Sequence, residues 1–117
     1  MWSNIFLLAL AGGSGTVLRY LVQKNLNGGF PLGTLAVNIT GCLLFGLLWG
    51  YFSKNLEAQK QLILLTGFCG GFTTFSSFSA EGLQMLMDQR WFSFFIYTAA
   101  SIVIGLLFTL VGFKITS

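Results

Sequence analysis

Neutral hydrogen-bonding groups recur at helical spacing in two apolar stretches of the chain. Thr34 and Asn38 are four residues apart, and so are Tyr97 and Ser101. At this spacing two side chains lie on the same face of a helix. Such faces can present hydroxyl and amide donors to a small anion, or they can hydrogen-bond to neighbouring helices, as polar residues in membrane bundles routinely do. Residue type alone leaves both interpretations open.

A third stretch is unusually rich in glycine, threonine and serine. It reads Gly-Phe-Cys-Gly-Gly-Phe-Thr-Thr-Phe-Ser-Ser-Phe-Ser-Ala-Glu over residues 67–81. Each glycine destabilises a helix by about 1 kcal/mol relative to alanine, and the threonines at 73 and 74 can hydrogen-bond to the backbone. We therefore predict a broken helix here in preference to a glycine-rich packing face. Such a break frees carbonyl oxygens, which bind cations in several transporter folds.

Phe75 and Phe78 follow this break at a spacing of three. The edges of aromatic rings carry partial positive charge and can face an anion. Packing is the ordinary role of phenylalanine in a chain that has 13 of them. The position of this pair among serine hydroxyls at a helix break weakens the argument for simple packing.

The elements that carry these residues belong in a membrane. Hydrophobic residues make up 55% of the 117 residues and charged residues 8%, against about 25% charged in soluble domains. Four uncharged stretches each approach the roughly 20 residues that cross a bilayer. We predict an all-α integral membrane protein, a single membrane domain over residues 1–117, with transmembrane helices at 2–23, 32–53, 60–86 and 91–114. The break in the third helix then falls near the bilayer midplane, where non-helical backbone must be buried in protein or line a cavity.

The composition also argues against several functions. The chain has no histidine, which removes histidine-ligated zinc and serine–histidine catalysis. No other nucleophile–base pair can be assembled, so we do not expect an enzyme. The net charge of +3 comes from scattered residues, which gives no basic patch for nucleic acid.

The basic residues are balanced between the two sides of the membrane. Four spans place both termini and the loop at 54–60 on one side. Three basic residues lie on that side and three on the other: Lys54, Lys60 and Lys114 against Arg19, Lys24 and Arg90. The positive-inside rule therefore predicts no clear preference for one orientation in the membrane. Insertion in both orientations, and insertion in one orientation set by a single residue or lipid, are both compatible with this balance.

The chain resembles the Fluc (CrcB) family of bacterial fluoride channels over essentially its full length. The motifs that carry the resemblance are Gly-Gly-Ser-Gly-Thr-Val-Leu-Arg-Tyr at 12–20, Gly-Thr-Leu-Ala-Val-Asn at 33–38 and the stretch at 67–81. The resemblance implies a multi-pass protein of the bacterial inner membrane that assembles as an antiparallel, dual-topology homodimer. It also implies two fluoride pores through the dimer, one on each side of its axis.

The resemblance also implies roles for individual residues. Asn38, Phe75 and Phe78 match positions that line the pore, and Thr34, Tyr97 and Ser101 match a polar file along the anion path. Arg19 matches a basic residue at a pore vestibule, and Glu81 closes the signature. The backbone carbonyls of Gly70 and Thr73, from both subunits, match a central site for a structural sodium ion. Some relatives place a further hydroxyl at Gly105, so the polar file is shorter here or filled by water.

The function implied is a passive channel that exports cytoplasmic fluoride and so confers fluoride resistance. Neutral donors can replace the hydration of a small anion without the deep well that a lysine would create. A small multidrug-resistance-type transporter would need a membrane-embedded carboxylate for proton coupling, and Glu81, at one end of the third span, is the only candidate. A membrane anchor subunit, the other alternative, would have no use for Asn38 or the hydroxyls.

Overall fold

The computed structural model describes residues 2–117 and is helical along nearly all of this length. Four helical segments are long and apolar enough to cross a membrane, which confirms the predicted fold class. The first, second and fourth are α1 (Trp2–Leu26), α2 (Leu32–Phe52) and α6 (Trp91–Thr116). The third, Ala58–Met87, is composite. It consists of α3 (Ala58–Gln61), the π-helical segment η1 (Leu62–Cys69), α4 (Gly70–Phe72) and α5 (Phe75–Met87).

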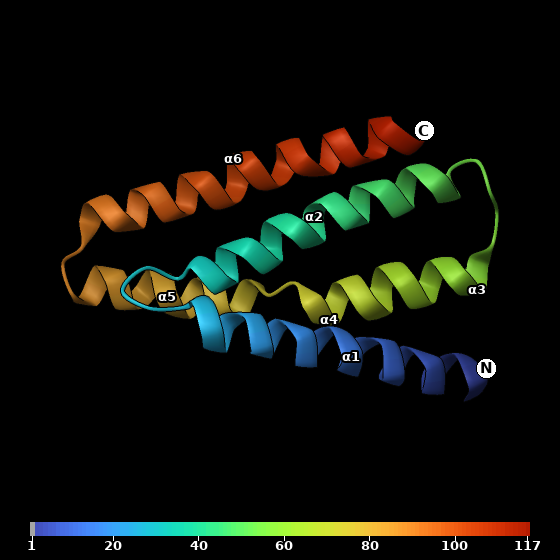
Figure 1. The fold of residues 1–117 in the computed structure, drawn as a ribbon, viewed down its shortest axis with the longest axis horizontal. Coiled ribbons are helices and arrows are strands. Elements are labelled where there is room, and N and C mark those ends of the chain that lie inside the picture. Colours follow the sequence, from blue (N-terminus) through green and yellow to red (C-terminus); the bar gives the residue numbers. More distant parts are fainter. Residues whose placement is uncertain (1) are drawn as a thin grey trace.

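The predicted break in the third span is confirmed, and it lies between α4 and α5. Thr73 (φ −86°, ψ 157°) and Thr74 (φ −150°, ψ 115°) have extended backbones. Thr74 then starts the next helix as its N-cap, because its Oγ1 accepts a hydrogen bond of 3.1 Å from the Ser77 N–H. In Figure 1 the two halves of the third span, α4 and α5, are joined by this short non-helical segment.

Glycines let the spans pack closely in two pairs. α6 runs beside α2 over most of its length (Figure 1). A Cβ at Gly112 of α6 would lie 2.5 Å from the carbonyl oxygen of Leu43 in α2, too close for any other residue. On the other side of the bundle α1 packs against η1 and α4, where a Cβ at Gly71 would collide with the carbonyl of Gly12. The first half of the third span, η1 and α4, thus packs against α1, whereas α5 packs against α6 and α2.

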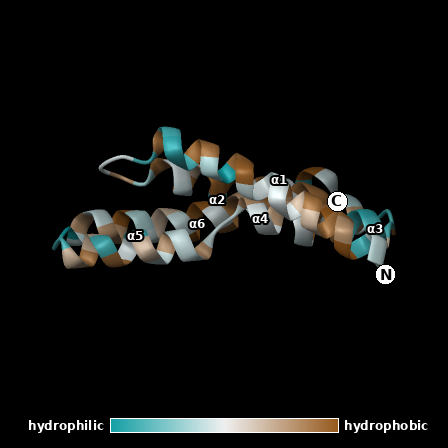
Figure 2. Cartoon of the chain, turned by 90° about the horizontal axis from the view of Figure 1, so that it is seen from below, coloured by the Kyte–Doolittle hydropathy of each residue, from teal (hydrophilic) through white to brown (hydrophobic). Residues whose placement is uncertain are grey.

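The outer surface is apolar along the spans and polar at their ends, as expected of helices that face lipid. Figure 2 shows hydrophobic ribbon through the middle of the molecule and hydrophilic ribbon at its two ends. Large apolar side chains project from the chain; Trp2, Phe92 and Leu106 are examples, with exposed fractions of 78%, 79% and 68%. Few side chains are buried within a single chain. Polar groups inside a membrane protein are costly, so the polar side chains that are buried here are candidates for a functional role.

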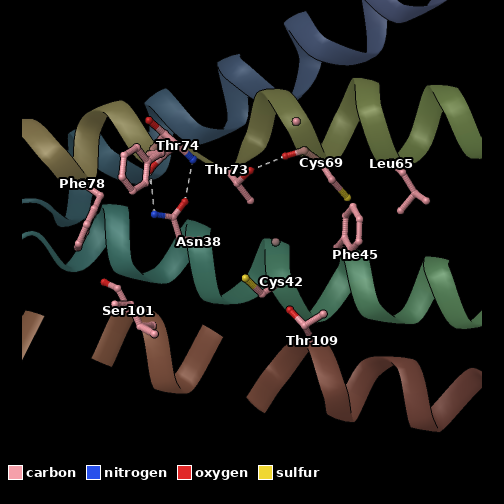
Figure 3. A pocket seen from close by; sticks show the side chains of 14 residues that line it. Asn38, Cys42, Phe45, Leu65, Cys69, Thr73, Thr74, Phe78, Ser101 and Thr109 are labelled. Carbon is pink, nitrogen blue, oxygen red and sulfur yellow. Dashed lines mark hydrogen bonds between the residues drawn. The ribbon is translucent and has the colours of Figure 1, made fainter. Parts of the chain in front are cut away.

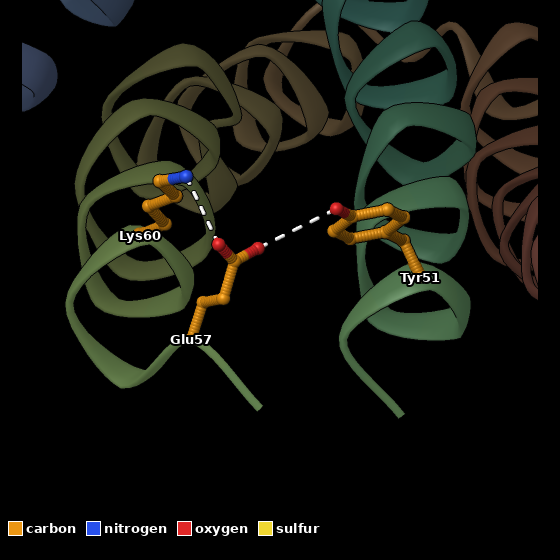
Figure 4. Close-up of polar contacts among 3 residues, drawn as sticks. All are labelled: Tyr51, Glu57 and Lys60. Atoms are coloured by element: carbon orange, nitrogen blue, oxygen red, sulfur yellow. Dashed lines mark hydrogen bonds and ion pairs between the residues drawn. The ribbon is translucent and has the colours of Figure 1, made fainter. Parts of the chain in front are cut away.

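Polar contacts fix the loop between α2 and the third span. The Lys60 ammonium forms an ion pair of 2.9 Å with Glu57, and the Tyr51 hydroxyl donates to the same carboxylate over 3.4 Å (Figure 4). The pair is exposed, with 69% of the Lys60 side chain accessible, so it contributes little stability. Its consequence is local: one of the three basic residues on this side is partly neutralised.

Candidate anion pathway

A cavity of about 500 Å³ opens where α2, the break and α6 meet. Figure 3 shows its wall, with Asn38 and Ser101 on one side and the unwound threonines on the other. Most of the lining is apolar. The cavity brings together six of the residues singled out from the sequence: Asn38, Gly70, Thr73, Phe75, Phe78 and Ser101.

Asn38 holds the unwound backbone in place. Its Nδ2 donates to the Thr74 carbonyl over 3.0 Å, and its Oδ1 accepts from the Thr74 N–H over 2.8 Å. The side chain therefore pairs with residue 74 as a neighbouring strand would. An amide has two N–H donors and this pairing uses one of them. The second N–H remains available to the cavity that Asn38 lines.

The break frees the two carbonyls that the resemblance assigns to a cation. In an unbroken helix, the Gly70 carbonyl would accept from the Thr74 N–H, and the Thr73 carbonyl from the Ser77 N–H. Both of these N–H groups have other acceptors here, Asn38 Oδ1 for the first and Thr74 Oγ1 for the second. Gly70 and Thr73 also line the cavity, and there is open space where a Cβ of Gly70 would be. Free carbonyl oxygens of this kind are suitable ligands for a hard cation.

Arg19 binds the break from α1. Its Nε donates to the Gly71 carbonyl over 3.1 Å, and one terminal nitrogen donates to the Gln23 side chain over 3.2 Å. Arg19 is not part of the cavity wall. Its positive charge therefore lies next to the unwound segment, where it satisfies one of the carbonyls that the break exposes.

Three aromatic rings form a row from the cavity into the bundle. The ring centroids of Phe75 and Phe78 are 5.6 Å apart with the planes tilted by 43°, and those of Phe78 and Tyr97 are 5.1 Å apart. Phe78 is half-buried, whereas Phe75 is 78% exposed. Within one chain the Phe75 ring is therefore largely uncovered, although both phenylalanines line the cavity.

Thr34 and Tyr97 lie in a second polar group centred on Glu81 of α5. The hydroxyl of Thr34 donates to Glu81 Oε2 over 2.9 Å, Asn27 Nδ2 donates to the same oxygen over 2.9 Å, and the Tyr97 hydroxyl donates to Oε1 over 3.0 Å. Thr34 and Tyr97 are both fully buried. Hydrogen bonds to a carboxylate are stronger than those between neutral groups, so these three donors hold the Glu81 side chain inside the bundle.

The orientation of the Thr34 hydroxyl follows from its partners. Gln23 Nε2 and Asn27 Nδ2 both donate to Thr34 Oγ1, over 2.9 and 3.2 Å. A hydroxyl has two acceptor lone pairs and one proton. Because the lone pairs are taken, the proton must point to Glu81. A continuous chain of hydrogen bonds thus runs from the Gly71 carbonyl through Arg19, Gln23 and Thr34 to the carboxylate.

Sequence reasoning missed two members of this second group, Gln23 and Asn27. Glu81 was singled out as the end of a motif and as the only candidate carboxylate for proton coupling, but not as the centre of a hydrogen-bonded group. Arg19, Gln23 and Asn27 are spaced by four residues, which could have shown one polar face at the end of the first span. An ionisable residue inside a span is itself a sign of function.

The fold and the cavity define a class: a small polytopic helical membrane protein with neutral polar groups inside a broken-helix bundle. A family model described as CrcB-like protein, Camphor Resistance (CrcB), matches residues 6–113. A relative from Flavobacterium psychrophilum, named fluoride-specific ion channel FluC, is 44% identical over 93% of each chain. Relatives of the same name from Nitratidesulfovibrio vulgaris and Nitrosococcus oceani are 43% and 40% identical, over 88% and 99% of this chain and 88% and 98% of theirs.

The chain therefore belongs to the CrcB-like family. This is a family of ion channels and not of enzymes, as the sequence predicted. None of these relatives is named as a member of the two alternative classes, a small multidrug-resistance-type transporter or a membrane anchor.

Proposed function

We propose that this protein is a fluoride-selective channel of the bacterial inner membrane that lets cytoplasmic fluoride leave passively and so confers fluoride resistance. The names of the relatives support fluoride as the ion. The single observation that carries the proposal is the chemistry of the cavity. Its polar groups are neutral, and two of them have unused donors: the second N–H of Asn38 and the hydroxyl of Ser101, which is buried without a partner.

Neutral donors suit a conducted anion. Fluoride is small and strongly hydrated, so an apolar passage without donors would exclude it. A lysine or arginine in the passage would bind the ion too firmly for release, because conduction needs sites that are favourable to enter and easy to leave. Among the described residues that line the cavity there is no Lys, Arg, Asp or Glu. This wall fits passive conduction and offers no carboxylate for proton exchange.

The proposed assembly is an antiparallel homodimer of chains inserted in both orientations. The equal number of basic residues on the two sides supports dual insertion. The exposed Phe75 ring supports a partner, because it lines the cavity that contains the Asn38 and Ser101 donors and yet is 78% exposed in a single chain. A second chain packed on this face would cover Phe75 and complete the wall of the anion path.

A structural sodium ion at the centre of the dimer is the proposed cofactor. The fit rests on the Gly70 and Thr73 carbonyls, whose helical donors have been diverted to Asn38 and Thr74. Two neutral oxygens from each chain suit a hard monovalent cation, whereas calcium would normally need carboxylates. When bound, the ion would supply a positive charge beside the two breaks. Gly70 and Thr73 hold it through backbone atoms, so their side chains are not required.

The proposed physiological role can be tested by complementation. The gene is expressed in a bacterial strain that lacks its own fluoride exporter, and growth is measured against fluoride concentration. We expect this chain to restore growth in fluoride and to have no effect on growth in equal chloride. Membrane-inserted protein that leaves the strain as sensitive as the empty vector would contradict the proposal.

A further inference from the structure

Two hydroxyls of α6 are buried and yet have no hydrogen-bond partner. Serine and threonine in a helix commonly donate to the carbonyl four residues earlier. Ser14 donates to Leu10, Thr73 to Cys69 and Thr109 to Gly105 in this way, over 2.8, 2.9 and 3.0 Å. Within residues 2–117, the buried side-chain polar atoms without a hydrogen-bond partner are Thr98 Oγ1 and Ser101 Oγ. Ser101 is part of the proposed anion path, but Thr98 has no assigned role.

The helical period places Thr98 against α2. Thr98, Gly105 and Gly112 are spaced by seven residues, which returns to nearly the same face of a helix. Gly112 packs on the Leu43 carbonyl, and a Cβ at Gly105 would contact the sulfur of Cys42 at 3.4 Å. Both contacts are made to α2. Thr98 therefore faces the inside of the α2–α6 pair, and its oxygen is buried there rather than exposed to lipid.

The position of Thr98 along α6 is between the two polar groups of the site. It follows Tyr97, whose hydroxyl donates to Glu81, and it precedes Ser101, which lines the cavity. Three residues of helix rise by about 4.5 Å. No other residue between Tyr97 and Ser101 has a polar side chain. The Thr98 hydroxyl is thus buried at a level of α6 between the two groups, one turn before Ser101, although Thr98 itself is not among the residues that line the cavity.

A buried hydroxyl without a partner is unfavourable, and few are found in native proteins. Two of them within one helical turn indicate a ligand that accepts hydrogen bonds. Side chains three residues apart have Cβ atoms about 5–6 Å apart, a separation that two hydrogen bonds of about 2.7 Å to one shared acceptor can span. Thr109 donates to the carbonyl four residues earlier, whereas the Thr98 hydroxyl makes no such hydrogen bond.

We propose that the Thr98 hydroxyl is a further anion donor, which together with Ser101 binds one small, strongly hydrated halide at the Ser101 wall of the cavity. This inference rests on the proposed channel function and adds a residue to its pathway. It assigns the role to the hydroxyl and not to the methyl group, so serine can replace threonine and valine cannot.

The test compares fluoride efflux from liposomes for Thr98→Val, Thr98→Ser and Thr116→Val. Valine keeps the shape of threonine without its hydroxyl. Thr116→Val is the matched control, because Thr116 is on the same helix but does not line the cavity, and its hydroxyl donates to the carbonyls of Leu47 and Gly112. We expect Thr98→Val to lower the unitary efflux rate about tenfold, equivalent to about 1.4 kcal/mol, and to raise the fluoride concentration that gives half-maximal efflux. Thr98→Ser and Thr116→Val should stay within about twofold of the unchanged chain, well inside that difference.

Other outcomes separate this inference from the channel function itself. If the unchanged chain passes fluoride and Thr98→Val passes it equally well, with lower thermal stability only, the hydroxyl holds a structural water and the inference is overturned. If the unchanged chain passes no fluoride, the proposed function fails first. If Thr98→Val does not fold, the same comparison is made between Thr98→Ala and Thr98→Ser, and equal efflux from these two would also overturn the inference.

Discussion

Replacing Asn38 by leucine should both destabilise the protein and stop conduction. The amide makes two hydrogen bonds to the Thr74 backbone, of 3.0 and 2.8 Å, and Thr74 is 8% exposed. Leucine would leave a buried N–H and a buried carbonyl without partners. Each such group costs about 1–3 kcal/mol, so the free energy of unfolding should fall by about 2–6 kcal/mol. That is a large part of the roughly 5–15 kcal/mol that stabilises a typical domain.

The assay is thermal unfolding of purified protein in detergent, followed by fluoride efflux from liposomes. At about 4 °C per kcal/mol for a chain of about this length, the melting temperature should decrease by at least about 8 °C. Thr40→Val is the matched control, since Thr40 is an exposed residue two positions further along α2. Asn38→Asp should be intermediate in stability, because it keeps the acceptor for the Thr74 N–H and loses the donor. An Asn38→Leu variant that has the same melting temperature as the Thr40→Val control and conducts fluoride normally would refute the reasoning.

Three further predictions concern the rings, the topology and the cation. Phe78→Ile should strongly lower fluoride efflux while the proposed dimer persists in size-exclusion chromatography, since an aliphatic side chain preserves most of the packing but has no ring edge. Unchanged efflux would show that the ring only packs. Two lysines added to the loop at 54–60 should fix that loop in the cytoplasm, as read by C-terminal reporter fusions, and activity should fall unless an oppositely biased variant is co-expressed. Full activity from one uniformly oriented variant would contradict an antiparallel dimer. Complete replacement of sodium by a large organic cation should lower fluoride efflux and readdition should restore it; efflux that is indifferent to sodium would leave the Gly70 and Thr73 carbonyls without their proposed ligand.

The architecture could be predicted from the sequence because the lipid bilayer allows few backbone structures inside it. Uncharged stretches of about 20 residues must be helices, since the bilayer satisfies no backbone groups. The break was predictable for a local reason: glycines followed by Thr73 and Thr74 favour an interruption, and the extended backbone is at these two threonines. The π-helical winding of η1 was not predicted, because it has no comparable signature in composition or periodicity.

The site was less predictable because its hydrogen bonds join distant segments. Asn38 was expected as an anion donor, but its two bonds to Thr74 span 36 residues and depend on the exact register of α2 against the break. Thr34 and Asn38 share a helical face, yet Thr34 is bonded to Glu81 and Asn38 to Thr74. Periodicity identifies which residues share a face; it does not tell which partner each of them meets.

The central claim is that the cavity, with its few neutral donors, conducts fluoride and discriminates against larger halides. The most direct test is to reconstitute the purified chain in liposomes and to follow efflux with fluoride- and chloride-selective electrodes under the same ion gradient. The account predicts rapid fluoride efflux, with no requirement for a proton gradient, and chloride efflux no faster than from empty liposomes. Chloride efflux equal to that of fluoride, or no fluoride efflux from folded protein, would contradict it.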